Sequence, residues 1–193
     1  LAKKLGLYGG NFSVSNVISS ILGLGFTGES QQVKFEVASN AATLISPDPQ
    51  ELNALLPAPP NPSERIVFLT DASTAQQCST CVSKDALAAD ALQKAVDRLY
   101  GQGGSGQVFN SRMSSFSFRE VELFLNGESE TNIESALERA TWVVVSLADV
   151  NNNQLSLLRR FFSERPNLIR NKNVILFSFT APYYLDATDI SKL

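Results

Sequence analysis

The chain has 193 residues, of which 44% are hydrophobic and 18% are charged, and it carries a formal net charge of -3 at pH 7. Its length suffices for one well-packed domain, and the acidic balance with scattered basic residues gives no electrostatic reason to expect nucleic acid or an anionic membrane as a partner. The sequence contains no histidine, which excludes a Ser-His-Asp or Cys-His mechanism and any histidine metal ligand within this chain.

The first part of the chain gives weak signals of regular structure. Residues 1–31 show no clear period and are expected to form a linker. From 32 to 45 apolar residues recur at helical spacing, and Pro47 and Pro49 would end this helix. Residues 56–63 predict a proline-rich connector, with a proline-rich recognition motif as the less favoured alternative.

Beyond the connector, apolar runs alternate with helical patterns. Strands buried on both faces are predicted at 65–70, 142–147 and 174–179, and a short further strand at 107–110. Helices are predicted at 86–100 (capped by Asp85), 118–125, 131–140 and 154–164. Buried strands separated by helices form a parallel sheet with helices on both faces. We therefore predict an α/β fold, a flavodoxin-like three-layer α/β/α sandwich with a mostly parallel sheet, truncated towards its C-terminal side.

The two cysteines, Cys78 and Cys81, have C-x-x-C spacing. This spacing occurs in thioredoxin-like redox motifs, but the Trp-Cys-Gly-Pro context of such motifs is missing here. A second C-x-x-C that would complete a zinc site is also missing from the sequence. We expect either a loop disulfide or two free thiols in preference to redox or metal chemistry.

Two glycine-rich stretches were considered as phosphate-binding loops. Residues 23–28 do not follow a strand pattern and lack the third glycine of a dinucleotide fingerprint. Residues 101–106 follow a predicted helix and lack a subsequent Lys-Ser/Thr pair. We expect irregular structure at the first, a flexible loop at the second, and no nucleotide cofactor.

The predicted strand ends carry polar and aromatic side chains, and open parallel sheets bind ligands beyond the carboxyl ends of their strands. The side chains at these ends include Asp71, Asp149, Asn151, Thr180, Tyr183 and Tyr184. Asp71 and Asp149 on one edge could form a metal site or an acid/base pair, although aspartate at such a place more often caps a helix or turn. The two tyrosines could stack on a sugar ring, with core or domain-interface packing as the favoured alternative.

Three segments resemble glycoside hydrolase family 3. Residues 174–185 (Val-Ile-Leu-Phe-Ser-Phe-Thr-Ala-Pro-Tyr-Tyr-Leu) are similar to a strand and loop of the family's second domain, closest to the β-N-acetylglucosaminidase branch. Residues 1–8 resemble the segment that leaves the catalytic barrel, and residues 37–45 resemble the helix that opens the second domain. The segments occur in the family's order and span nearly the whole chain, although residues 76–127 contain no diagnostic motif.

The resemblance implies a two-part retaining enzyme in which an N-terminal barrel binds the sugar and supplies an aspartate nucleophile. In the β-N-acetylglucosaminidase branch the barrel also supplies a His-Asp acid/base pair, which the absence of histidine excludes here. In the β-glucosidase branch a glutamate of the second domain is the acid/base, but this chain has Ala148-Asp149 where a Gly-Glu pair is expected. We assign this chain no catalytic residue, no cofactor and no metal.

We therefore interpret the chain as an accessory domain that is inactive by itself. Residues 1–31 would be the linker that follows a catalytic barrel missing from this sequence, and residues 32–193 would form the sandwich. Its partners would be the barrel of the same polypeptide and, through the parent enzyme, a carbohydrate substrate. The residues expected to face the barrel or its cleft are Asp149, Asn151, Thr180 and Tyr183. The start at Leu1 and the abrupt end at Leu193 are those expected of a fragment or processed chain. The alternative is a free-standing flavodoxin-like binding or interaction module.

Neither hypothesis fixes a cellular compartment. The sequence shows no recognisable signal peptide and no apolar stretch of transmembrane length, so we expect no membrane-spanning segment in it. Both a cytoplasmic and a secreted location are compatible with these features.

Overall fold

The structure is a computed structural model that describes residues 28–46, 50–51, 57–75, 78–80, 82, 84–148 and 152–179. The chain divides into two compact units, Leu1–Leu56 and Pro57–Leu193. The division falls at the start of the proline-rich stretch, whose composition favours an extended connector over a packed element.

Helix α2 (Gly28–Ala41) belongs to the first unit, and its bounds differ from those of the predicted helix. It begins at Gly28 instead of residue 32 and ends at Ala41 instead of residue 45. Its apolar side chains Val33 and Val37 are exposed. Helical spacing therefore located the helix, but spacing carries no information about whether another surface covers it.

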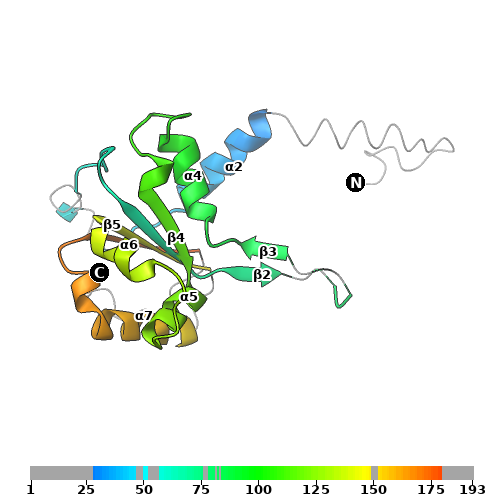
Figure 1. Cartoon of the computed structure of the whole chain (residues 1–193). Coiled ribbons are helices and arrows are strands. Elements are labelled where there is room, and N and C mark those ends of the chain that lie inside the picture. Colours follow the sequence, from blue (N-terminus) through cyan, green and yellow to red (C-terminus); the bar gives the residue numbers. More distant parts are fainter. Residues whose placement is uncertain are drawn as a thin grey trace. The chain divides into compact units, whose positions relative to one another are not determined.

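A four-stranded sheet forms the middle layer of the second unit (Figure 1). Its strands are β1 (Ile66–Thr70), β4 (Met113–Ser117), β5 (Trp142–Leu147) and β6 (Asn173–Ser178). They lie in the order β4-β1-β5-β6, and every neighbouring pair is parallel. The two central strands, β1 and β5, are buried along their whole length, as their continuous apolar sequences predict. The sheet confirms the predicted α/β fold.

Helices cover the sheet from both sides (Figure 1). The described helices of this unit are α4 (Ala91–Tyr100), α5 (Phe118–Leu125), α6 (Ile133–Arg139) and α7 (Asn152–Glu164), with short 3₁₀ turns at Asn110–Arg112 and Pro166–Leu168. Leu92 and Val96 of α4 pack on one face of the sheet, whereas α5, α6 and α7 contribute to the core on the other. Right-handed crossovers explain this division. The connection from β1 to β4 crosses the sheet in one direction, whereas those from β4 to β5 and from β5 to β6 cross it in the other, so their helices lie on opposite faces.

The larger core lies between the sheet and helices α5, α6 and α7. Alternate residues of the strands, such as Val67 on β1 and Val143 on β5, point into it. The helices contribute fully buried side chains from their apolar faces, among them Ile133 on α6 and Phe161 on α7. This core is where most of the hydrophobic stabilisation of the second unit arises, because burial of apolar area is the main favourable term in folding.

The opposite face of the sheet is covered only in part by described residues. Ile66, Phe68, Trp142 and Val144 are buried there together with side chains of α4. On the neighbouring strand β6, Ile175 and Phe177 are in register with Val144 and Ser146 and therefore face the same side. They are 37% and 47% exposed, and Phe179, just after the strand, is 56% exposed. The prediction that this strand is buried on both faces is therefore wrong, because on this face α4 contacts β4, which lies at the opposite edge of the sheet from β6.

Two predicted elements are corrected by the structure. Residues 84–87 form strand β3 (Lys84–Leu87), which pairs antiparallel with β2 (Ser73–Ala75) in a ribbon that projects from the sheet (Figure 1). The helix predicted from residue 86 therefore starts only at Ala91, and Asp85 does not cap it. The strand predicted at 107–110 is displaced to β4, whose Met-Ser-Ser-Phe-Ser sequence has too few apolar residues to be recognised.

The predicted helix at 118–125 has the observed bounds of α5, because both signals at its start are local. Ser117 and Glu120 form a capping box, in which the Ser117 backbone N–H donates to the Glu120 carboxylate at 2.7 Å. We expect Ser117→Ala to lower the free energy of unfolding by about 1 kcal/mol, since one cap acceptor is lost. Urea denaturation monitored by circular dichroism measures this loss. An unchanged midpoint would show that the Glu120 side chain alone suffices to start α5.

The Lys172 side chain caps the C-terminal end of helix α6. Its ammonium donates to the carbonyl oxygens of Ala140 at 2.6 Å and Glu138 at 3.3 Å, groups that the helix itself leaves without partners. Partial burial lowers the pKa of Lys172, and the Glu138 carboxylate opposes this shift. The side chain therefore satisfies carbonyl groups at the end of the helix.

Candidate functional site

The carboxyl ends of β1 and β5 meet at the topological switch point of the sheet. The chain leaves β1 towards β4 on one side and leaves β5 towards β6 on the other. Numbered by their sequence order, the four strands lie across the sheet in the order 2-1-3-4, as in the flavodoxin-type arrangement. In that arrangement ligands bind in the crevice between the first and third strands. In this chain those strands are β1 and β5, so the switch point is the candidate functional site.

Asp71 directly follows β1, and its buried carboxylate bridges the switch point. Its backbone N–H donates to the carbonyl of Ser146 at 2.9 Å, which extends the pairing of β1 with β5. Its carboxylate accepts hydrogen bonds from the backbone N–H of Ala148 at 3.2 Å and from the side-chain amide of Gln154 at 3.3 Å. Asp71 thereby ties the end of β1 to the end of β5 and to the first turn of α7.

A row of hydroxyl side chains crosses the sheet beside Asp71. Thr70 is in register with Ser117 on β4 and with Ser146 on β5, so the three side chains project from the same face. Ser117 caps α5, whereas the buried hydroxyls of Thr70 and Ser146 have no hydrogen-bond partner within the described parts of the chain. Most buried polar groups in proteins are hydrogen-bonded, so this pair is unusual.

Thr70 and Ser146 were not among the predicted site residues. The available signal was a hydroxyl residue at or next to the end of two strands that otherwise consist of apolar residues. Their adjacency depends on the register between strands far apart in the sequence, which periodicity does not specify.

Of the predicted site residues at the strand ends, the structure describes Asp71. Those that lie outside the described residues are Asp149, Asn151, Thr180, Tyr183 and Tyr184. The pairing of Asp71 with Asp149 therefore stays a prediction. The described contacts of Asp71 are of the kind expected for an aspartate that fixes a loop and a helix start, which was the alternative considered for it.

The described part of the switch point offers hydrogen bonds rather than a pair of reacting groups. Hydrolysis of a glycoside ordinarily needs two carboxylates, and Asp71 is the one buried carboxylate among the described residues at this edge. No group of three or more His, Cys, Asp or Glu side chains that could hold a metal ion occurs among the residues that the structure describes. The arrangement suits the positioning of loops or the binding of a polar ligand.

The cysteine motif lies away from the switch point, in the loop that joins β2 and β3. Cys78 is disulfide-bonded, one of the two states predicted for it, and Cys81, the other cysteine of the sequence, lies outside the described residues. A disulfide-bonded cysteine provides no thiolate for metal binding. The motif therefore contributes a covalent link to the ribbon rather than a metal site.

The glycine-rich stretch 101–106, predicted as a loop, is folded into hydrogen-bonded turns. The N–H groups of Gly104 and Gly106 both donate to the carbonyl of Gly101 at 2.9 Å. Gly106 has a φ of 73°, which favours glycine, and a side chain at Gly101 would bring Cβ to 2.3 Å from the carbonyl oxygen of Asp97. Because these amides are used within the turn, they do not form a cradle for a phosphate.

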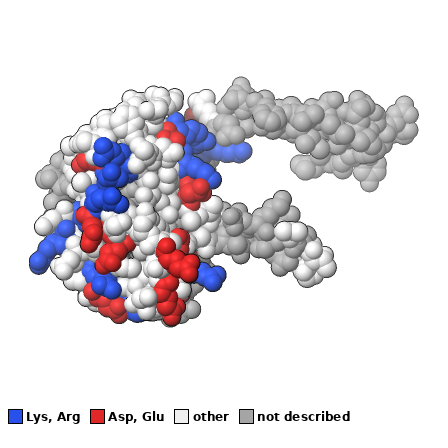
Figure 2. Space-filling model, viewed as in Figure 1, with Lys and Arg blue, Asp and Glu red and all other residues white. Residues whose placement is uncertain are grey.

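Acidic and basic side chains are interspersed over the face of the molecule seen in Figure 2. This face shows no field of one sign of the kind that attracts nucleic acid, in agreement with the small net charge. Among the described helices, none combines the length and the apolar character needed to cross a membrane.

No family model, no curated protein and no solved structure matches the chain.

Proposed function

We propose that the chain is the accessory α/β/α domain of a retaining glycoside hydrolase of the β-N-acetylglucosaminidase type and is inactive by itself. The domain braces a catalytic barrel of the same polypeptide and lines part of its substrate cleft. The barrel binds the carbohydrate and supplies the nucleophile and the acid/base group. The proposed barrel-facing residues are Asp149, Asn151, Thr180 and Tyr183.

The observation that carries this proposal is the exposed apolar surface formed by Ile175 and Phe177 on β6 and by Phe179 just after the strand. Parallel sheets are ordinarily covered on both faces, and contiguous exposed apolar side chains mark a surface on which another protein part packs. The same strand opens the segment 174–185, one of the three segments that resemble the family. An accessory domain that docks through this surface accounts for both features.

The chemistry of the described residues also supports an accessory role. The chain has no histidine, and a single buried carboxylate, Asp71, occurs at the described part of the switch point. That carboxylate already accepts two hydrogen bonds that fix the ends of β5 and α7. These groups hold the edge of a sheet together but do not form the pair of carboxylates that a retaining mechanism uses.

The direct test is hydrolysis of a chromogenic N-acetylglucosaminide and a chromogenic glucoside. The 193-residue chain and the full-length gene product that we propose are assayed side by side. We expect the longer product to cleave the N-acetylglucosaminide and the 193-residue chain to cleave neither substrate. Turnover by the 193-residue chain would contradict the proposal, and so would a longer product that cleaves neither glycoside.

Phe177→Ser tests the docking surface separately from the chemistry. In the longer product we expect the substitution to lower the free energy of unfolding by about 1.5–3 kcal/mol, because a side chain buried against the barrel is lost. In the 193-residue chain the loss should stay below about 1 kcal/mol, since Phe177 is 47% exposed there. Urea denaturation of both proteins measures the difference.

Leu99→Ser is the matched control for this comparison, because Leu99 is an exposed apolar residue on α4 and lies away from β6. It should have a small effect in both proteins. Equal effects of Phe177→Ser in the two proteins would argue against docking through β6 and would favour the alternative, a free-standing flavodoxin-like binding or interaction module.

A further inference from the structure

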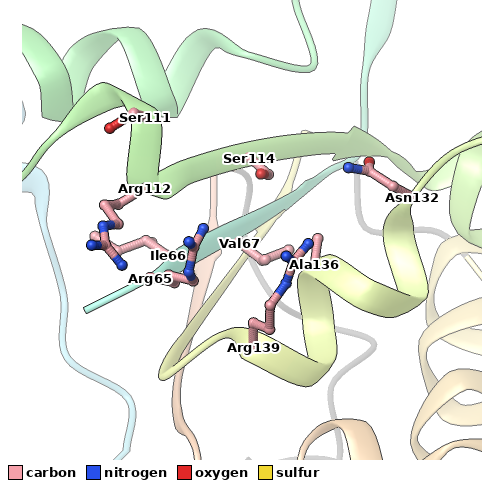
Figure 3. A pocket seen from close by; sticks show the side chains of 9 residues that line it. All are labelled: Arg65, Ile66, Val67, Ser111, Arg112, Ser114, Asn132, Ala136 and Arg139. Atoms are coloured by element: carbon pink, nitrogen blue, oxygen red, sulfur yellow. The ribbon is translucent and has the colours of Figure 1, made fainter. Parts of the chain in front are cut away.

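A small pocket lies at the amino end of the sheet, away from the switch point (Figure 3). Its cavity volume is about 190 Å³. Three arginines from separate segments gather around it: Arg65 immediately before β1, Arg112 from the turn before β4, and Arg139 at the end of α6. Ser111, Ser114 and Asn132 add polar groups to its wall.

The three positive charges are not neutralised by acidic side chains within the described parts of the chain. The ion pairs Lys94–Asp90 and Arg160–Glu164 lie outside the pocket, and none of its three arginines takes part in an ion pair within the described residues. Like charges that converge on one pocket repel one another, which costs free energy unless an anion joins them. Such an arrangement therefore favours a bound anion over an empty pocket.

Two of the arginines are held in place by hydrogen bonds that leave other donors available. Arg139 donates from Nε to the Ser135 carbonyl at 2.9 Å and from Nη2 to the Ser135 hydroxyl at 3.3 Å. Arg112 donates from Nη1 to the carbonyl of Ser63 at 3.4 Å. A guanidinium has five N–H donors, so each of these side chains is oriented and can still bind a ligand.

The size and charge of the pocket define the class of ligand. Pockets for drug-sized molecules enclose about 300–1,000 Å³, so this cavity suits a single compact group. Planar guanidinium groups match the oxygens of phosphate, and three of them favour a dianion over a monoanion such as a carboxylate. We propose that Arg65, Arg112 and Arg139 form a binding site for a phosphate group, either free phosphate or a small phosphate monoester.

This site is independent of the proposed accessory role, because it lies at the opposite end of the sheet from the switch point and uses none of the residues on β6. Loss of phosphate binding would leave the accessory-domain proposal intact. Likewise, failure of the accessory-domain proposal would leave the phosphate site intact, so each proposal can be overturned without the other.

The test is calorimetric titration of the 193-residue chain with inorganic phosphate and with glycerol phosphate, at constant ionic strength set with sodium chloride. Sulfate and acetate serve as comparison anions. We expect saturable binding of phosphate, and removal of one charge-assisted contact by Arg65→Gln or Arg139→Gln should weaken it about tenfold or more. Tighter binding of glycerol phosphate would identify a monoester as the ligand, and tighter binding of inorganic phosphate would identify free phosphate.

Arg119→Gln is the matched control, because it removes the same charge from an exposed position on α5 outside the pocket. It should leave phosphate binding unchanged. Arg139 is itself exposed and makes its hydrogen bonds within its own helix, so its substitution should preserve folding, which circular dichroism checks. The proposal is overturned if phosphate shows no saturable binding, if acetate binds as tightly as phosphate, or if the pocket variants bind like the control.

Discussion

Replacement of Phe161 by alanine is expected to lower the free energy of unfolding by about 3–5 kcal/mol. Phe161 lies on α7, is fully buried and belongs to the larger core cluster between the sheet and helices α5, α6 and α7. Its removal would lose the transfer free energy of the ring and leave a cavity that the packed strands and helices can fill only in part. Urea denaturation of the 193-residue chain gives the change directly.

Phe177→Ala is the matched control, since it removes the same side chain from the exposed face of β6. We expect a loss of only about 1 kcal/mol there, because the Phe177 side chain stays 47% exposed in the folded chain. Similar losses for the two substitutions would mean that the larger core does not dominate the stability of the second unit. A much larger loss for Phe161→Ala would locate the stabilising core on the side of α5, α6 and α7.

The parts of the fold that could be predicted from the sequence are those specified by nearby residues. The runs that became β1 and β5 are continuously apolar, which is the pattern of a strand covered on both sides. Helix α5 was predicted with its observed bounds because Ser117 and Glu120 mark its start within one turn. An element can therefore be predicted from the sequence where the residues that specify it lie within it or within one turn of its start.

The parts that were missed depend on pairing between distant segments. Strand β3 contains Lys84 and Asp85 and has no apolar alternation, so only its pairing with β2 makes it a strand. Strand β4 is polar at three of five positions and is held at the edge of the sheet by β1. The exposure of β6 has the same origin, because its sequence resembles that of a buried strand and the position of α4 decides the outcome.

The candidate sites show the same limit. The ends of β1 and β5 were expected to meet, since parallel strands align their carboxyl ends. The orphan hydroxyls of Thr70 and Ser146 require the register of the two strands, which the apolar pattern leaves open. The pocket of Arg65, Arg112 and Arg139 requires the connections from β1 to β4 and from β4 to β5 to be placed correctly. Basic residues that are scattered in the sequence thereby form a local cluster in the fold.

Asp71→Ala is expected to cost about 2–3 kcal/mol of unfolding free energy, because hydrogen bonds to a charged acceptor are lost and their donors remain near the buried edge of the sheet. The donors are the Ala148 N–H and the Gln154 amide, both positioned by the carboxylate. Asp71→Asn should cost distinctly less. Its side-chain oxygen can still accept from Ala148, and rotation of the Gln154 amide can restore the second hydrogen bond.

In the longer glycoside hydrolase of which we propose this chain to be a part, this pair of variants separates a positioning role from a chemical one. If Asp71 only fixes the ends of β5 and α7, glycoside hydrolysis should follow stability, so that Asp71→Asn keeps most of the activity and Asp71→Ala loses more of it. If Asp71 acts as a general acid or base, Asp71→Asn should abolish hydrolysis while its unfolding midpoint stays close to that of the parent, because an amide cannot exchange the proton. The second result would contradict the assignment of catalysis to the barrel alone and would place a reacting carboxylate at the switch point between β1 and β5.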